Sequence, residues 1–250
     1  MIANTIEPVL LDLGNFQVRY YGIIYALGFI ICYLFLRSYI KKGKLKGLTE
    51  NGLDDLMVYL LAGTVLGARL FNFVFYHPSV FWTDPVEIIR IWNGGLSFHG
   101  GLIGAALAAY IFAARRKINF LEIADAISVP AALALALGRI GNFTNHELYG
   151  PLTIVPWCVV FMTAEGCRHP YQIYASLSHL VLFGILAYVY KRQKKAGTTF
   201  LSFVTIYGAF RFMTDFFREE PRLMGISMGQ FLSLIMLAAG LISIIKRRKN

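Results

Sequence analysis

Seven long apolar segments, separated by polar connections, constrain this chain most strongly. As a helix, each is long enough to cross a hydrocarbon layer about 30 Å thick, which takes roughly 17 to 25 residues. They lack the sustained two-residue alternation that is typical of barrel strands. The sequence therefore predicts an all-α, polytopic integral membrane protein, with residues 1–250 forming one membrane-embedded domain. The seven predicted transmembrane helices occupy residues 20–39, 54–76, 96–114, 121–138, 172–190, 199–217 and 227–245.

The positions of the charged residues matter more than the formal net charge of +10. Charged residues make up 15% of the chain, against about 25% in soluble domains, and 57% of the residues are hydrophobic. In a soluble protein, such a basic chain would suggest nucleic-acid binding. Here most basic residues lie in clusters that follow every second apolar segment, so the charge reflects membrane topology. We therefore expect no nucleic-acid partner.

These basic clusters also predict an orientation. They occupy residues 41–46, 115–117, 191–195 and 246–249, and basic connections stay on the cytoplasmic side of a membrane. We expect the N-terminus outside and the C-terminus in the cytoplasm. No Lys or Arg precedes Arg19, so the basic start of a cleavable secretion signal is missing.

All basic residues outside these clusters are arginines. Apart from Arg37, they lie at the outer ends of predicted helices, in outer connections or within helices. A guanidinium offers a planar fork of donors that matches phosphate and carboxylate oxygens, which an ammonium does not. The pattern indicates recognition of an anion. The arginines are Arg19, Arg69, Arg90, Arg139, Arg168, Arg211, Arg218 and Arg222.

The first polar cluster ends the fourth predicted helix, where the apolar run "LALAL" gives way to "GRIGNFTNHELYG". Arg139 reaches the outer interface there, and Asn142, Asn145 and Glu147 follow within one or two turns. A lone arginine at this depth is as often a snorkelling residue, which only marks the membrane boundary, as it is a functional one. The neighbouring amides and carboxylate favour a binding cluster at the depth of lipid headgroups.

The second cluster is "NGGLSFHGGLIG", residues 93–104, where the third predicted helix begins at the outer side. A helix N-terminus presents free N–H groups that favour an anion such as phosphate, and Gly100 and Gly101 allow close backbone approach. The same positive end favours a neutral imidazole at His99, which suits a base. The alternative is a packing motif of small residues with a hydrogen-bonded histidine.

The third cluster is "YGAFRFMTDFFRE", which starts at Tyr207. Tyr207, Arg211 and Asp215 are spaced four residues apart, so they share one face of a helix. A charge within a span is unfavourable unless it faces a partner or a polar cavity, and Asp215 is the expected partner of Arg211. The alternative is a purely structural ion pair.

Three further features leave alternatives open. Cys158 and Cys167 share one polar connection and pair only if it faces an oxidising compartment; free thiols are at least as well supported, because three cysteines show no disulfide framework. The apolar stretch 151–162 is too short and too proline-rich to span a membrane, so it is expected in an extramembrane connection. Arg69 lies within a span and needs a partner or a ligand.

These motifs together resemble the bacterial phosphatidylglycerol–prolipoprotein diacylglyceryl transferases. The resemblance rests on "HGGLIG" at His99, "GRIGNFTNHELYG" at Gly138, "RHPYQIY" at Arg168 and "YGAFRFMTDFFRE" at Tyr207, and it runs nearly end to end. It implies an enzyme of the bacterial inner membrane with its active site toward the outer leaflet. Such an enzyme moves diacylglyceryl from phosphatidylglycerol to the lipobox cysteine thiol of a prolipoprotein signal peptide, as the first step of lipoprotein maturation. The product is a thioether, and glycerol phosphate leaves.

The resemblance also implies which residues matter. Asp215 stands where the family often has a glutamate, with a shorter reach toward Arg211. His146 stands at a position often held by glycine, so no role is assigned to it. The family's important residues fall on Tyr21, His99, Arg139, Asn142, Glu147, Tyr207 and Arg211.

The chemistry assigns roles to these residues. The substrate thiol must lose its proton, which suits a neutral His99, and the leaving phosphate ester must be stabilised, which suits Arg139 and Arg211. Tyr207 would position the headgroup or relay a proton. The nucleophilic cysteine belongs to the substrate, and no cofactor or metal is expected. Together with Arg139, the predicted substrate-binding residues are Tyr21, Gly100, Gly101, Asn142, Asn145, Glu147 and Asp215.

Two other classes of protein also place arginines in membrane helices. A transporter is expected to show internal repeats or helices broken at the midplane. The sequence contains no convincing repeat, and its polar groups gather at one leaflet. A lipid-binding scaffold with an outer-leaflet anion site explains the arginines but gives His99 no task. The expected partners of the transferase are phosphatidylglycerol, the prolipoprotein signal peptide and membrane lipids.

Overall fold

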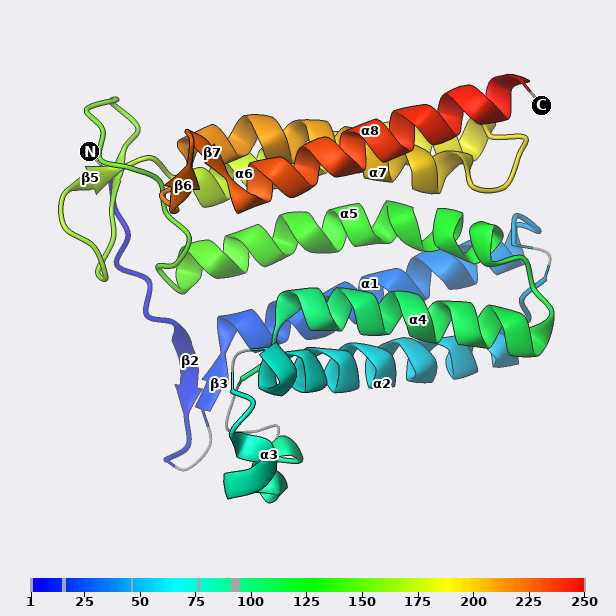
Figure 1. Ribbon diagram of the computed structural model, residues 1–250, viewed down its shortest axis with the longest axis horizontal. Helices are drawn as coiled ribbons and strands as arrows, with labels where there is room; N and C mark the ends of the chain where they lie inside the picture. Colours follow the sequence, from blue (N-terminus) through cyan, green and yellow to red (C-terminus); the bar gives the residue numbers. More distant parts are fainter. Residues whose placement is uncertain (1, 15–16, 46, 76, 91–94, 250) are drawn as a thin grey trace. The chain divides into compact units, whose positions relative to one another are not determined.

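The computed structural model describes residues 2–14, 17–45, 47–75, 77–90 and 95–249. Within this part of the chain, seven long helices coincide with the seven predicted segments (Figure 1). Tyr76, the last residue of the second predicted segment, and Lys46 of the first basic cluster lie outside the described residues. The helices are α1 (Tyr20–Lys41), α2 (Glu50–Phe75), α4 (Phe98–Arg116), α5 (Phe120–Thr144), α6 (Tyr171–Arg192), α7 (Thr198–Thr214) and α8 (Met228–Lys249).

Five of these helices are long and apolar enough to cross a membrane, by length and composition, in the part of the chain that was described. They are α1, α2, α5, α6 and α8. The prediction of an all-helical membrane protein is thereby confirmed in this coarser form. The helices α4 and α7, with 19 and 17 residues, do not meet the same conditions.

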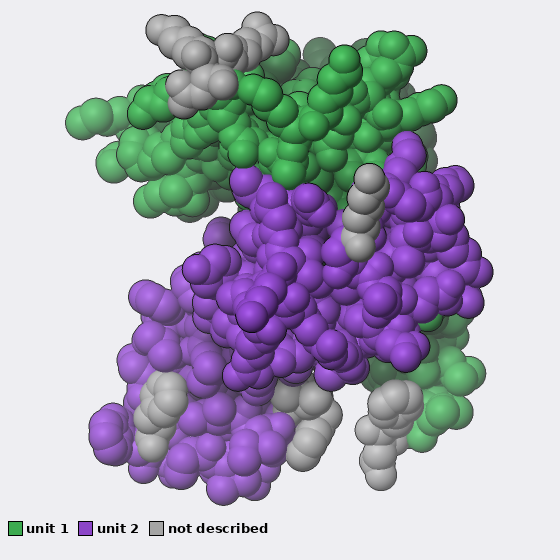
Figure 2. Space-filling view, turned by 90° about the vertical axis from the view of Figure 1, so that its right-hand side faces the viewer, with its two compact units in different colours: residues 1–35, 125–250 green, residues 36–124 purple. Residues whose placement is uncertain are grey.

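The described chain forms two compact units, residues 1–35 with 125–250 and residues 36–124, which are coloured separately in Figure 2. We describe each unit by itself. The single domain over residues 1–250 stays a prediction.

In the first unit, α7 packs against both α6 and α8. Gly240 of α8 faces Thr205 of α7 so closely that no Cβ would fit between them. Ser176 of α6 donates a hydrogen bond to the carbonyl of Ala136 in α5 (3.0 Å). The carboxylate of Asp125 in α5 accepts bonds from the amides of Gly197 (2.5 Å) and Phe200 (2.7 Å), and so satisfies free N–H groups at the start of α7.

In the second unit, α2 and α4 pack through paired glycines. Gly63 and Gly67 of α2 lie opposite Gly104 and Gly100 of α4. A Cβ at any of the four would collide with the backbone of the other helix. This is the arrangement of small residues by which membrane helices approach one another closely.

The connections carry short strands that the apolar pattern does not reveal, because each has only two to four residues. Strand β4 (Val159–Val160) pairs with β1 (Ile2–Ala3) and β5 (Cys167–Arg168). The other two pairs are β2 (Val9–Asp12) with β3 (Gln17–Arg19) and β6 (Arg222–Leu223) with β7 (Ile226–Ser227). The remaining short helices are α3 (Val80–Thr83), η1 (Pro85–Ile88) and η3 (Asp215–Phe217).

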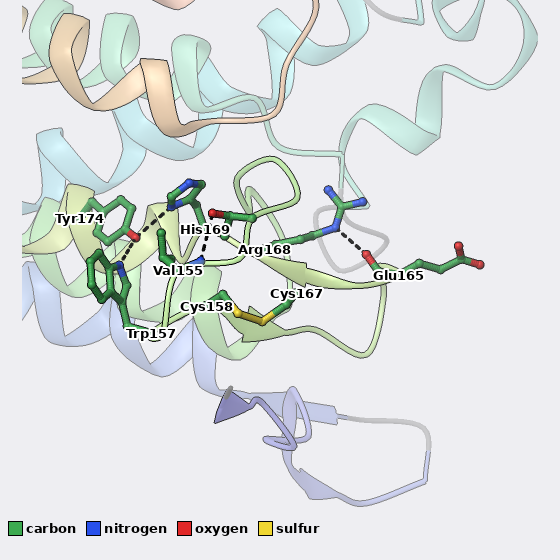
Figure 3. Close-up of a disulfide and its surroundings, with 9 residues drawn as sticks. Val155, Trp157, Cys158, Glu165, Cys167, Arg168, His169 and Tyr174 are labelled. Carbon is green, nitrogen blue, oxygen red and sulfur yellow. Dashed lines mark hydrogen bonds between the residues drawn. A yellow bond between two sulfur atoms is a disulfide. The ribbon is translucent and has the colours of Figure 1, made fainter.

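The connection between α5 and α6 contains a disulfide between Cys158 and Cys167, the pairing that the sequence left open (Figure 3). The same connection is anchored on α6, because Trp157 donates a hydrogen bond to the hydroxyl of Tyr174 (2.8 Å), which also bonds His169 (3.1 Å). The stretch 151–162 forms no helix, as its length and prolines predict.

We expect Gly104→Ala to lower the thermal unfolding temperature, because the added methyl group meets the backbone of Gly63. Overpacking of this kind costs about 1–3 kcal/mol. The matched control is Gly184→Ala in α6, where nothing lies within 4 Å of the added Cβ. Thermal unfolding of both variants in one detergent, followed by circular dichroism, tests the packing. Equal unfolding temperatures would contradict it.

Candidate active site

The end of α5 turns Glu147 back toward its own helix. The amide of Glu147 donates to the carbonyl of Asn142 (3.1 Å), and the amide of His146 donates to that of Phe143 (3.2 Å). His146 between them has a φ of 54°. These are the two bonds and the left-handed residue of a Schellman motif, which closes a helix C-terminus. Left-handed backbone favours glycine, which accounts for the glycine that the resemblance implies at position 146.

This turn builds a polar chain at the C-terminal end of α5. Asn142 donates through Nδ2 to Glu147 Oε1 (2.7 Å), and its Oδ1 accepts from the guanidinium of Arg139 (3.4 Å). Asn142 is buried, whereas Arg139 is half-buried. Tyr21 of α1 packs on Gly141 and lies within electrostatic reach of Asn142 and Glu147. The structure therefore brings together four of the residues predicted for the site.

His146 has structural contacts instead. Its Nε2 bonds the carbonyl of Ile6 (2.7 Å), and its own carbonyl accepts from the hydroxyl of Thr163 (2.6 Å). Gln172 of α6 likewise donates to the carbonyl of Glu147 (2.6 Å). Both side chains anchor the turn. Asn145 lies in the same turn, half-buried, and its Oδ1 has no partner among the described residues.

The predicted pair on α7 is formed. Arg211 Nε lies 3.5 Å from Asp215 Oδ2, and Asp215 is fully buried. Its other oxygen accepts a hydrogen bond from the hydroxyl of Tyr171 (2.7 Å). Tyr207 bonds the Arg211 side chain from one turn earlier. Gly229, in the first turn of α8, leaves the space that the Arg211 and Asp215 side chains occupy, because a Cβ there would meet both.

Tyr171 joins the two clusters of the first unit. Its ring centroid lies 5.7 Å from the guanidinium carbon of Arg139 and 5.8 Å from that of Arg218. Distances of this size are typical of cation–π contacts. The ring of Tyr171 thus faces Arg139 while its hydroxyl holds Asp215. Sequence reasoning missed Tyr171, although it lies within the quoted motif "RHPYQIY".

His179 of α6 was also missed. Its ring stacks on that of Tyr207, with centroids 5.5 Å apart, and it is 3% exposed. Both Arg139 and Arg211 lie within its electrostatic reach. The available signal was a histidine two turns inside an apolar segment, where a polar side chain calls for a functional explanation.

In the second unit, Arg69 finds its partners within the protein. Buried in α2, it donates to the carbonyls of Ile88 (3.0 Å) and Arg90 (2.7 Å), and to both the carbonyl and the carboxylate of Glu87. Its guanidinium also lies over the ring of Phe73. These contacts fix the connection after α2, and they answer the requirement for a partner that the sequence raised.

His99 lies in the first turn of α4, where the sequence places it. The side chain of Ser97 caps this helix by accepting from the amide of Gly100. His99 is exposed, and its ring stacks with that of Phe71 at 6.4 Å. Gly100 packs against α2, the alternative considered above, and Gly101 faces Thr64. A substrate-binding role for these glycines, and a place for His99 beside Arg139, stay predictions.

The first unit therefore holds the guanidinium groups of Arg139 and Arg211 near Tyr171, at the C-terminal ends of α5 and α7. Arg211 is neutralised by a buried carboxylate, and Arg139 is held by a neutral amide whose other end binds Glu147. Fold and site define a helical membrane protein with a cluster of arginines, held by carboxylate and amide partners, at the C-terminal ends of α5 and α7.

Comparison with known proteins gives the family. The model of the prolipoprotein diacylglyceryl transferase family matches residues 8–246. The chain belongs to this family.

Several curated relatives carry the name phosphatidylglycerol–prolipoprotein diacylglyceryl transferase. One from Geobacter sulfurreducens is 42% identical and covers 98% of this chain and 97% of its own length. One from Bordetella parapertussis is 40% identical over 94% and 93% of the two chains. A third, from Rickettsia canadensis, is 36% identical over 96% of both chains.

We expect Asn142→Asp to destabilise the protein by about 1–3 kcal/mol, because it replaces a donor to Glu147 with a second carboxylate in a buried position. Asn145→Asp adds the same charge three residues away, where no bond to Glu147 is lost, and serves as the matched control for stability. Unfolding by denaturant in detergent measures both. A loss no larger than that of the control would show that the Asn142–Glu147 bond does not support the turn.

Proposed function

We propose that this chain transfers the diacylglyceryl group of phosphatidylglycerol to the cysteine thiol of prolipoproteins. The observation that carries the proposal is family membership over residues 8–246, together with relatives of that name that align along nearly the whole chain. The thiolate sulfur attacks the glyceryl carbon that bears the phosphate, the carbon–oxygen bond breaks, and glycerol phosphate leaves with the bonding electrons. The thiol proton passes to a base, and the product is a thioether.

The acceptor is the lipobox cysteine of a prolipoprotein signal peptide, held in the bacterial inner membrane. Seven spans, with the N-terminus outside, place the ends of α5 and α7 at the outer leaflet. The alternating basic clusters support this orientation. The Cys158–Cys167 disulfide supports it independently, because disulfides persist on the oxidising side of a bacterial membrane.

Arg139 and Arg211 bind the phosphate and stabilise the charge that grows on it as the carbon–oxygen bond breaks. Their separate support, by Asn142 and by Asp215, fixes both guanidinium groups before substrate arrives. Preorganised donors of this kind avoid rearrangement during the reaction. Tyr207 orients Arg211 and the lipid headgroup. Tyr21, Asn142, Asn145, Glu147 and Asp215 shape the substrate site.

His99 takes the proton of the thiol, while the amides at the start of α4, near Gly100 and Gly101, assist the arginines in stabilising the leaving phosphate. An unaided thiol has a pKa of about 8.5, and apolar surroundings raise it. A positioned imidazole therefore supplies the deprotonation that the reaction needs at neutral pH. A transporter or a passive lipid-binding scaffold accounts less well for the family match.

We expect Arg139→Lys to insert normally and to lose transfer activity by about 10²- to 10³-fold, because a point charge does not reproduce a bidentate contact with phosphate. Arg37→Lys, on the opposite side of the membrane in the proposed topology, is the control and should keep wild-type turnover. The measurement is transfer of labelled diacylglyceryl to a lipobox peptide. Wild-type turnover of Arg139→Lys would remove Arg139 from the site.

Reporter fusions test the topology through activity on either side of the membrane. The basic clusters predict a cytoplasmic reporter after the first, third, fifth and seventh predicted helices and an external one after the second, fourth and sixth. A cytoplasmic location is expected after Lys44, Lys117, Lys195 and Asn250, and an external one near Thr83, Thr163 and Pro221. An external report after Lys117 would show that a span has been miscounted.

We expect His99→Gln to keep lipid binding and to slow transfer by about 10²- to 10⁴-fold, the usual contribution of a positioned base. The variant should regain rate as pH rises toward the thiol pKa, since the substrate then ionises unaided. Lipid affinity, thermal stability and a pH–rate profile on the purified variant are the measurements. Parallel losses of affinity and stability with a flat profile would show that His99 only anchors the helix.

A further inference from the structure

The imidazole of His179 is held by two neighbours. It stacks on Tyr207, with ring planes 14° apart, and Tyr207 stacks in turn on Phe203, with centroids 5.6 Å apart. It is also hydrogen-bonded to the backbone of Leu135 in α5, and it is 3% exposed. A side chain with this many restraints has one orientation, as a preorganised binding group requires.

One nitrogen of this ring, Nδ1, is buried, and no group in the described part of the chain forms a hydrogen bond with it. The bond to Leu135 therefore uses Nε2. The amide of Leu135 is committed within α5, so the carbonyl accepts and Nε2 carries the proton. Nδ1 then presents a lone pair. A buried acceptor without a donor is unfavourable and points to a missing partner.

The surroundings indicate what that partner is. Arg139 and Arg211 both lie within electrostatic reach of the ring, and they favour an anion beside a neutral imidazole. The remaining acceptor needs a donor that is itself uncharged, because an added cation would meet two guanidinium groups. A hydroxyl that belongs to a phosphate ester satisfies both conditions at once.

We propose that His179 determines headgroup specificity by accepting a hydrogen bond from a glycerol hydroxyl of the lipid donor through Nδ1. The proposal rests on the placement of the lipid phosphate between Arg139 and Arg211. It gives the enzyme a means to prefer a hydroxyl-bearing phosphodiester over one of the same charge and size without hydroxyls. His179 contacts the leaving group and takes no part in deprotonating the thiol.

The test compares two donor lipids on the full-length protein: phosphatidylglycerol and phosphatidylpropanol, which has the same phosphodiester and carbon chain but no hydroxyls. The wild type should favour phosphatidylglycerol by roughly 10- to 100-fold in kcat/KM, the range for one buried hydrogen bond. His179→Phe keeps a flat ring against Tyr207 but lacks the acceptor. Its rate with phosphatidylglycerol should fall by about that factor and its rate with phosphatidylpropanol should stay, so that the preference approaches unity.

Two further variants separate this from a structural role. His179→Gln carries an amide oxygen and should restore much of the preference. Phe203→Leu disturbs the same ring stack without touching an acceptor and should slow both donors alike. Where turnover of phosphatidylpropanol is too slow to follow, its inhibition constant against phosphatidylglycerol gives the same comparison.

A wild type without preference, or a His179→Phe variant that keeps the wild-type preference, would overturn the proposal. So would equal losses on both donors in His179→Phe. Failure of the phosphate placement itself has a different signature, since Arg139→Lys would then transfer diacylglyceryl at the wild-type rate.

Discussion

The buried carboxylate of Asp215 is the group on which the polar site depends. A charge that is fully removed from solvent inside an apolar helix bundle requires close partners. Asp215 has two, the guanidinium of Arg211 on its own chain segment and the hydroxyl of Tyr171 at the start of α6. The ring of Tyr171 then faces Arg139 of α5. One carboxylate thus sets the relative positions of the two arginines that face the proposed substrate.

The arginines of this chain divide into two kinds by their contacts. Arg69 is saturated by carbonyls and a carboxylate of the connection after α2, so its contribution is to the fold. Arg139 is held by one long bond to a neutral amide and by the face of a tyrosine, and its other donors bond no group among the described residues. The same residue type therefore has a structural role at one position and a proposed binding role at the other, and only the contacts around each guanidinium distinguish the two.

The sequence predicts the helices well because an apolar run of sufficient length has few alternatives. It also predicts the Arg211–Asp215 pair, since side chains four residues apart on one helix lie close together.

The sequence does not predict contacts between helices. Tyr171 and His179 reach the site through the packing of α5, α6 and α7, and the glycine pairs of α2 and α4 depend on the register between two helices. The left-handed turn at His146 needs a tertiary bond to Ile6, and the short strands and the disulfide depend on how a long connection folds.

The most direct measurement is a structure of the protein in nanodiscs that contain phosphatidylglycerol. The lipid phosphate is predicted to lie within about 2.7–3.2 Å of nitrogen atoms of both Arg139 and Arg211, beside Tyr171. A phosphate bound elsewhere, with both guanidinium groups turned to protein acceptors as Arg69 is, would contradict the assignment of this site to the lipid donor.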